Sequence, residues 1–121
     1  MYVFKGVRLA QKFEALVLGD SRFEMPSQRH LGMVVFRLKG ENEQTEKLLK
    51  RLNFRGTIHA VPASLKGKYV IRFTVTSTRT TNADILMDWN EIKMVATELL
   101  ALSNVLIERR VPLKGNFMLF F

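Results

Sequence analysis

The sequence predicts an α+β domain in which helices pack on one face of an open, mainly antiparallel sheet. Three segments repeat apolar residues every three or four positions, which is the spacing of one face of a helix. Four shorter apolar segments lie between them and are bounded by turn-forming residues such as glycine and proline, as strands usually are. The resulting order is helix, strand, strand, helix, strand, strand, helix. A layer of helices on one side of the sheet is the simplest way to bury all of these apolar stripes.

The first helix is expected over residues 2–18, and Gly19 is a natural stop for it. Its apolar face carries Phe4, Val7, Ala10, Phe13 and Val17. A short strand at residues 23–25 follows, and Pro26 either confines it to the edge of a sheet or ends it. The continuous apolar run at residues 31–38, which is rich in β-branched side chains, predicts a well-buried strand.

The second helix is expected to begin at Asn42, which is a plausible N-cap, and to end at Gly56. Acidic residues crowd its first turn and basic residues lie near its far end, as the helix dipole favours. Its apolar stripe is formed by Leu48, Leu49 and Leu52. This segment therefore predicts an amphipathic helix that covers part of the sheet.

Two further strands are expected at residues 57–61 and 69–76, joined by a loop that contains Pro62 and Gly67. Thr81 and Asp84 have the spacing of a capping box and mark the start of a last helix that ends near residue 102. Its buried face is expected to carry Ile85, Trp89, Ile92, Ala96 and Leu99. Beyond this helix the sequence is apolar with basic residues interspersed and has no clear period. We therefore place one domain at residues 1–102 and a divergent tail at residues 103–121.

The composition of the 121 residues excludes several classes of protein. The chain has no cysteine, so a disulfide framework or a cysteine-based metal site is ruled out. No apolar run approaches the roughly 20 residues that a membrane-spanning helix needs, and the N-terminus does not resemble a signal peptide. The sequence thus indicates a cytoplasmic domain. The net charge of +8 suits a polyanion, but interleaved acids favour a solvated surface, or one that meets an acidic partner domain, over nucleic-acid binding.

The side chains that could carry chemistry on their own form no recognisable catalytic pattern. Nothing in the sequence brings Ser64 together with His59 and a carboxylate, and the glycine–serine–glycine elbow of many hydrolases is missing. His30 and His59 lack the partners at short spacing that a metal site requires. We expect His30 to form hydrogen bonds at the entry to a strand, and His59 to pack within a strand or to face another domain.

Several segments taken together resemble the C-terminal domain of the group II pyridoxal-phosphate-dependent amino-acid decarboxylases. The shared segments are residues 13–17, 20–24 and 36–40 together with the pair Arg72 and Phe73. Residues 29–32 and 80–90 are more similar to the animal histidine decarboxylases than to the aromatic-L-amino-acid decarboxylases, which are near relatives. The likeness covers about residues 3–102. Each segment alone is a weak signal, whereas the set in this order is specific.

The resemblance implies a small C-terminal domain of a fold-type-I enzyme, packed on a large domain that binds pyridoxal 5'-phosphate. It also implies a homodimeric parent enzyme with active sites at the subunit interface. The parent enzyme would convert L-histidine to histamine and carbon dioxide, with decarboxylation of aromatic amino acids as the alternative. A stand-alone basic module that binds nucleic acid is a more distant alternative from a different class.

The residues of the chain itself predict that the catalytic machinery lies elsewhere. The reactive lysine of the family follows a histidine, and no His-Lys pair occurs here, so Lys39, Lys66 and Lys68 are poor candidates for it. We therefore expect no catalytic, cofactor-binding or metal-binding residue in this chain, and no activity from it alone. By the resemblance, Arg72 faces the active-site side of the domain and helps to orient the site. The alternative is that Arg72 forms a salt bridge that anchors its strand to the large domain.

Overall fold

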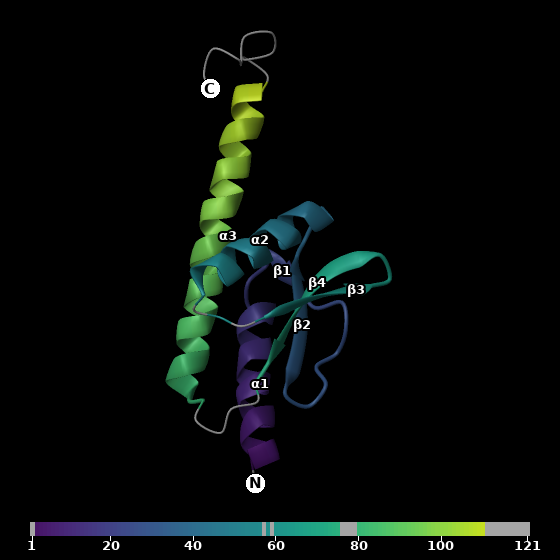
Figure 1. The fold of residues 1–121 in the computed structure, drawn as a ribbon, viewed down its shortest axis with the longest axis vertical. Coiled ribbons are helices and arrows are strands. Elements are labelled where there is room, and N and C mark those ends of the chain that lie inside the picture. Colours follow the sequence, from purple (N-terminus) through teal and green to yellow (C-terminus); the bar gives the residue numbers. More distant parts are fainter. Residues whose placement is uncertain (1, 57, 59, 76–79, 111–121) are drawn as a thin grey trace.

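Three helices lie together along one side of a four-stranded sheet (Figure 1). The computed structural model describes residues 2–56, 58, 60–75 and 80–110, including the side chains of those between residues 6 and 102. The helices are α1 (Tyr2–Leu18), α2 (Asn42–Arg55) and α3 (Asn82–Arg110), and the strands are β1 (Phe23–Glu24), β2 (Met33–Leu38), β3 (Val61–Leu65) and β4 (Lys68–Thr74). This order along the chain is the predicted one, and the α+β fold class is confirmed.

The sheet has the strand order β1-β2-β4-β3, and every pair of neighbours is antiparallel. The two central strands, β2 and β4, place Val34 opposite Phe73 and Phe36 opposite Ile71. Because side chains alternate between the two faces of a strand, these four residues point to the same side. That side faces the helices, and it forms the floor of the hydrophobic core.

Aromatic rings hold the helices against this floor. The ring of Phe13 on α1 stacks on Phe73 with 4.2 Å between centroids, and it meets Phe36 and Trp89 edge-on. Trp89 on α3 also packs edge-on against Phe23 of β1. Most residues of the predicted helix stripes are buried in this core, namely Ala10, Phe13, Val17, Leu48, Leu49, Leu52, Ile85, Trp89, Ile92, Ala96 and Leu99. Val7 is half-buried, and the side chain of Phe4 lies outside the described ones.

The predicted ends of the helices are confirmed where glycine or a capping pair was expected to set them. Gly19 follows the last residue of α1, and Gly56 closes α2 in the left-handed conformation, donating its N–H to the Leu52 carbonyl. At the start of α3 the Asp84 N–H donates to the Thr81 hydroxyl, and the Thr81 N–H donates to the Asp84 carboxylate. These two bonds form the capping box that the sequence predicted.

Three predicted boundaries are wrong. The third strand is Val61–Leu65 and begins where the predicted strand at residues 57–61 was to end, although residues 57 and 59 lie outside the described ones. Pro62 therefore lies within a strand, and only Lys66 and Gly67 separate β3 from β4. An edge strand tolerates proline because its outer side forms no ladder hydrogen bonds. The second strand begins at Met33, since Leu31 has a φ of 52° and takes part in a turn. Finally, α3 does not end near residue 102 but continues to Arg110.

Gly32 marks the place where three parts of the chain come closest. Its carbonyl accepts a hydrogen bond from the Val75 N–H at 2.9 Å. A Cβ atom built on Gly32 would lie only 2.9 Å from the Val75 carbonyl oxygen, and one on Gly6 of α1 would lie 3.2 Å from the same oxygen. The absence of side chains at these glycines therefore lets α1, the turn before β2 and the end of β4 pack together.

Candidate functional site

The second face of the sheet, which we call the open face, is covered by no helix in the described part of the chain (Figure 1). By the strand register its members are Glu24, Met33, Val35, Arg37, Val61, Ala63, Leu65, Lys68, Val70, Arg72 and Thr74. Val35 and Val70 are buried although they lie outside the main core cluster, and the apolar residues of β3 are half-buried. The open face is thus an apolar surface that carries charged side chains.

Arg37 is the most constrained charged residue of this face, with only 3% of its surface exposed. Its Nη1 donates to Glu24 Oε2 at 2.6 Å, and its Nη2 donates to the Gly40 carbonyl and to Asn42 Oδ1 at 3.0 Å each. Its Nε donates to the Tyr69 carbonyl at 3.2 Å. The bond from Arg37 holds the pKa of the Glu24 carboxyl below its ordinary value. Because every donor group of the guanidinium has a partner, Arg37 serves as a fixed cross-link between strands rather than a free ligand.

Asn42 completes this cross-link by connecting the start of α2 to the β3–β4 turn. Its Oδ1 accepts the Tyr69 N–H at 3.0 Å, and its Nδ2 donates to the Gly67 carbonyl at 3.0 Å. The prediction that Asn42 is the N-cap of α2 is wrong, because Glu41 occupies that position and its side chain forms no capping bond. The amide of Asn42 is instead used to hold the tip of the hairpin against the helix.

Arg72 lies near the centre of the open face, opposite Val35 on one side and Val61 on the other. It is exposed, and among the described residues it forms no hydrogen bond or ion pair. The geometry therefore leaves its guanidinium available to a group outside the described residues. It does not distinguish between a role in orienting an active site and a salt bridge to another domain, so both stay predictions.

The other residues singled out in the sequence are not brought together. His30 bonds through its main chain to Met33, at the entry to β2, whereas Ser64 is exposed on β3 and His59 lies outside the described residues. No group of three potential metal ligands occurs in the part of the chain that the structure describes. No helix among these residues is long and apolar enough to cross a membrane.

The lysines do not fit a pyridoxal-phosphate site. Lys39, Lys66 and Lys68 are all exposed, and a lysine that forms a Schiff base is normally activated by burial or by neighbouring charges in a closed pocket. Lys68 lies beside a shallow pocket near Arg37, but its side chain is half exposed and its nearest carboxylate is Glu24 at 3.9 Å. None of these three lysines therefore has surroundings that would activate it for a Schiff base.

Sequence reasoning missed Arg37 as a residue with a specific role, although a signal was present. Arg37 interrupts the apolar run of β2, and a charge inside a buried strand needs partners of its own. The position of a glutamate that could pair with it, on β1, follows only once the register is known.

Comparison with known proteins identifies the same segment in several decarboxylases. The chain is 64% identical to Drosophila melanogaster histidine decarboxylase over 113 residues, which is 93% of this chain and 13% of that protein. It is 47% identical to human histidine decarboxylase over 117 residues, covering 97% of this chain and 17% of that protein. Pig aromatic-L-amino-acid decarboxylase is 43% identical over 100 residues, or 83% of this chain and 21% of that protein. No protein-family model matches the chain.

Solved structures agree with these relatives. Catharanthus roseus tryptophan decarboxylase, in complex with L-tryptophan, superposes with a TM-score of 0.78 at 31% identity, over 81% of this chain and 22% of that one. Oryza sativa TDC, in a structure with PLP and tryptamine, also superposes with a TM-score of 0.78, at 29% identity over the same shares of the two chains. The chain thus spans less than a fifth of the histidine decarboxylases that it matches, and about a fifth of these solved structures.

Proposed function

We propose that the chain is the small C-terminal domain of an enzyme that converts L-histidine to histamine and carbon dioxide. The chain is homologous to one segment of the histidine and aromatic-L-amino-acid decarboxylases, which are pyridoxal-phosphate-dependent enzymes. The observation that carries this proposal is the 64% identity to a histidine decarboxylase along nearly the whole chain. When bound to the parent enzyme, pyridoxal phosphate would act as the electron sink for the carbanion left when carbon dioxide departs.

The choice of histidine rests on the higher identity to histidine decarboxylases, since aromatic-L-amino-acid decarboxylase is also similar at 43%. The test is to express the complete parent protein and to measure carbon dioxide release from L-histidine, DOPA and L-tryptophan. We expect the largest kcat/KM for L-histidine. A clear preference for DOPA would contradict the histidine assignment and leave the broader decarboxylase assignment in place.

Within the parent enzyme, the open face is proposed to dock on the large cofactor-binding domain, with the enzyme as a cytoplasmic homodimer. Half-buried apolar residues on an otherwise uncovered sheet support this arrangement, because such a surface is stabilised by a partner that removes it from water. Arg72 supports it too, because its exposed guanidinium is directed away from the helices by the strand register. The chain would then contribute packing and part of the wall around the site.

The cofactor is proposed to be held by the large domain alone. The complete 121-residue chain, mixed with pyridoxal phosphate and dialysed, should therefore retain no absorbance from a lysine Schiff base, and it should decarboxylate no amino acid. Retained absorbance that is lost on a single change such as Lys68→Ala would show that a lysine of this chain takes the cofactor.

Arg72 is proposed as a positioning residue that orients the active site from the docked sheet. In the complete enzyme, Arg72→Gln should lower kcat by about tenfold or more while the melting temperature and dimer content change little. Arg72→Lys keeps the charge but loses the planar guanidinium, so its kcat should lie between those of Arg72→Gln and the unsubstituted enzyme. A role as a structural anchor predicts the opposite pattern, in which stability falls and the kcat of the folded fraction is unchanged.

A further inference from the structure

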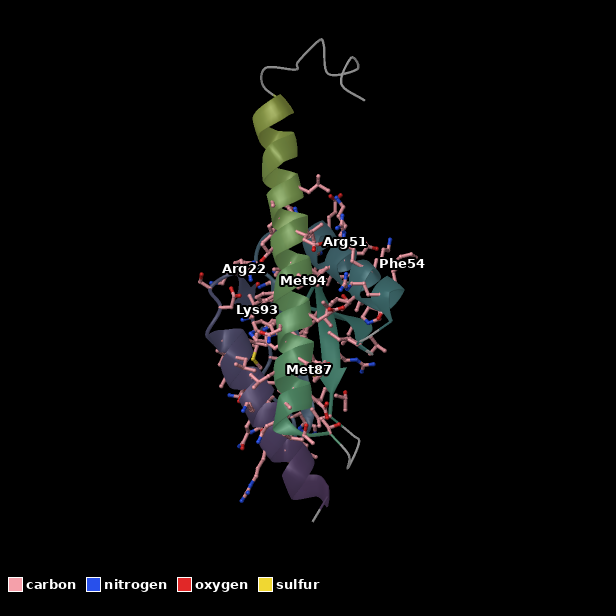
Figure 2. All side chains as sticks on the ribbon, turned by 90° about the vertical axis from the view of Figure 1, so that its left-hand side faces the viewer. Arg22, Arg51, Phe54, Met87, Lys93 and Met94 are labelled. Carbon is pink, nitrogen blue, oxygen red and sulfur yellow. The ribbon has the colours of Figure 1, made fainter. Side chains whose placement is uncertain are left out.

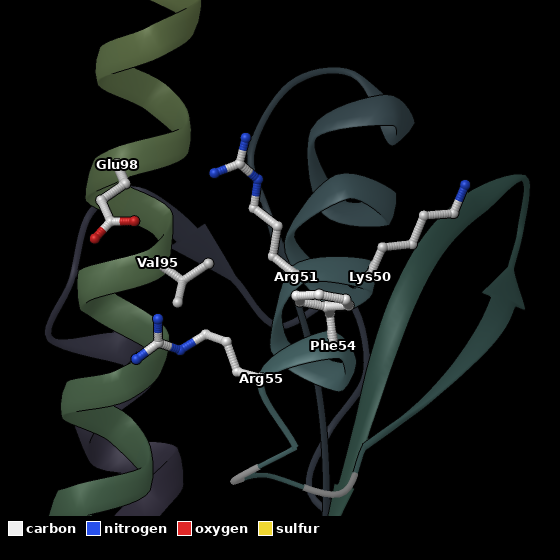
Figure 3. A pocket seen from close by; sticks show the side chains of 6 residues that line it. All are labelled: Lys50, Arg51, Phe54, Arg55, Val95 and Glu98. Carbon is white, nitrogen blue, oxygen red and sulfur yellow. The ribbon is translucent and has the colours of Figure 1, made fainter.

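A groove between α2 and α3 opens on the helical side of the molecule, away from the open face of the sheet. Its volume is about 400 Å³, and it is lined by Lys50, Arg51, Phe54, Arg55, Val95 and Glu98 (Figure 3). Arg51 and Arg55 extend from α2 toward α3, where Val95 projects toward α2. Because the helices separate the groove from the open face, docking of that face on another domain would leave the groove accessible.

The apolar part of the groove is unusual for a surface in water. Phe54 is 94% exposed, and among the described residues it is the most exposed of the large apolar side chains. Val95 at the base of the groove is almost completely covered. Figure 2 shows Arg51 and Phe54 on one flank of α3, with Met94, itself 41% exposed, on the helix beside them. A single exposed apolar residue needs no explanation, but the exposed ring of Phe54 at the edge of a groove offers a contact for an apolar side chain of a ligand.

The rim of the groove is positively charged. Lys50, Arg51 and Arg55 are three cations, against the single lining carboxylate of Glu98. Arg55 is already bound by both carboxylate oxygens of Glu91, whereas Lys50 lies 3.6 Å from Glu46 with 74% of its side chain exposed. Arg51 forms no hydrogen bond or ion pair with any described residue. Arg51, supported by Lys50, is therefore the cation left to attract a ligand.

From this combination we propose that the groove binds a short acidic segment of a partner protein. An apolar side chain of that segment packs on the exposed ring of Phe54, and flanking carboxylates meet Arg51 and Lys50. The charge of the rim selects acidic segments over basic ones, and the exposed ring of Phe54 selects those with a leucine or phenylalanine at the centre. Grooves between two helices commonly accept ligands in this way, with an apolar anchor and a charged rim.

The test uses the full 121-residue chain and short fluorescent peptides in which one leucine or phenylalanine is flanked by glutamates. Fluorescence anisotropy should show roughly micromolar binding that weakens as salt is added, as expected for contacts that depend on exposed charges. Replacement of the central apolar residue by serine, or of the glutamates by lysines, should abolish binding. Arg51→Glu and Phe54→Ala should each weaken binding by about tenfold or more, because each removes one of the two selecting features.

Arg8→Glu on α1 is the matched control, because it makes the same change of charge at an exposed position outside the groove. It should change binding by less than about twofold. The proposal is overturned if no acidic peptide binds, or if Arg8→Glu weakens binding as much as Arg51→Glu, since net charge alone would then explain it. It is also overturned if vesicles rich in phosphatidylserine bind the chain while the peptides do not. All three substituted side chains are exposed, and circular dichroism confirms folding before each titration.

Discussion

Asp88 lies half-buried on α3, and its environment disfavours the charged form of its carboxyl. Burial is the largest cause, and the nearby charges of Asp84 and Glu91 add to it, so that the pKa of Asp88 rises to about 6 from an ordinary 3.8. Between these two values the folded chain holds a proton that the unfolded chain has released. The free energy of unfolding therefore falls as pH rises through this window, and the loss is complete above about pH 6.

Asp88→Asn should consequently raise the melting temperature at neutral pH, because it removes a charge that the folded state disfavours. The gain should shrink as pH falls from about 6 and should be largely absent below about 4, where the aspartate is protonated in both states. Thermal unfolding followed by circular dichroism across this range measures the effect. Glu98→Gln, which removes an exposed carboxylate from the same helix, serves as the control and should not reproduce the gain at neutral pH. A lower melting temperature for Asp88→Asn at neutral pH would contradict this account.

Glu24 responds to pH with the opposite sign. Its pKa is lowered chiefly by the hydrogen bond from Arg37, so its contribution to stability is present above the pKa of the unfolded chain and is lost as pH falls through the folded value. Neither this pair nor Asp88 could be predicted from the sequence alone. The charged residues are visible there, but the pairing depends on the register of β1 with β2, and the burial depends on how α3 packs.

Among the elements, the helices were predictable because each has an apolar stripe and a local signal at an end. Gly19, Gly56 and the pair Thr81 and Asp84 act within one turn of the chain, so the sequence contains the whole of their effect. β3 was misplaced because Pro62 indicates a break when its position at the sheet edge is unknown. The positive φ of Leu31 belongs to the two-residue turn at Leu31 and Gly32, across which His30 and Met33 exchange both backbone hydrogen bonds, and a leucine gives no signal for that conformation.

Gly32→Ala tests the tight contact between the turn before β2 and the end of β4. The added methyl group would lie 2.9 Å from the Val75 carbonyl oxygen, and the Val75 backbone cannot move aside without disturbing the hydrogen bond that its N–H donates to the Gly32 carbonyl. We expect the free energy of unfolding in urea to fall by about 1–3 kcal/mol, as for other overpacked positions. Gly6→Ala should cost less, because its contact is longer and alanine favours a helix by about 1 kcal/mol. If Gly32→Ala were as stable as the unsubstituted chain, the contact would not be as tight as described.

At the scale of the whole molecule, the sequence predicted a fold and a family more readily than a site. The family resemblance and the order of elements agree with the comparisons and the structure, because apolar periodicity and shared segments are properties of the sequence itself. The role of Arg72 stays a prediction, since the group that would meet its guanidinium is not among the described residues. The groove between α2 and α3 was not predicted, because it joins residues from two helices whose relative placement the sequence does not give.

Removal of residues 103–121 should leave the fold intact. Among the side chains that the structure describes, the last core positions of α3 are Leu99 and the partly buried Leu100, so the predicted domain of residues 1–102 keeps every described side chain of the core. The truncated and full chains should unfold at similar temperatures, and sedimentation should show self-association of both through the uncovered apolar face. If the truncated chain unfolds while the full chain is a stable monomer, the boundary at residue 102 is wrong.

The strand order also affects how readily two copies of this domain would aggregate through the edges of their sheets. A sheet with free edges can template the addition of foreign strands and so start aggregation. Here one edge is β1, which is only two residues long, and the other is β3, where Pro62 has no N–H to offer. Both edges of the sheet are therefore poor templates for another strand. The fold thus limits polymerisation by backbone pairing between sheet edges, even where exposed apolar side chains favour association.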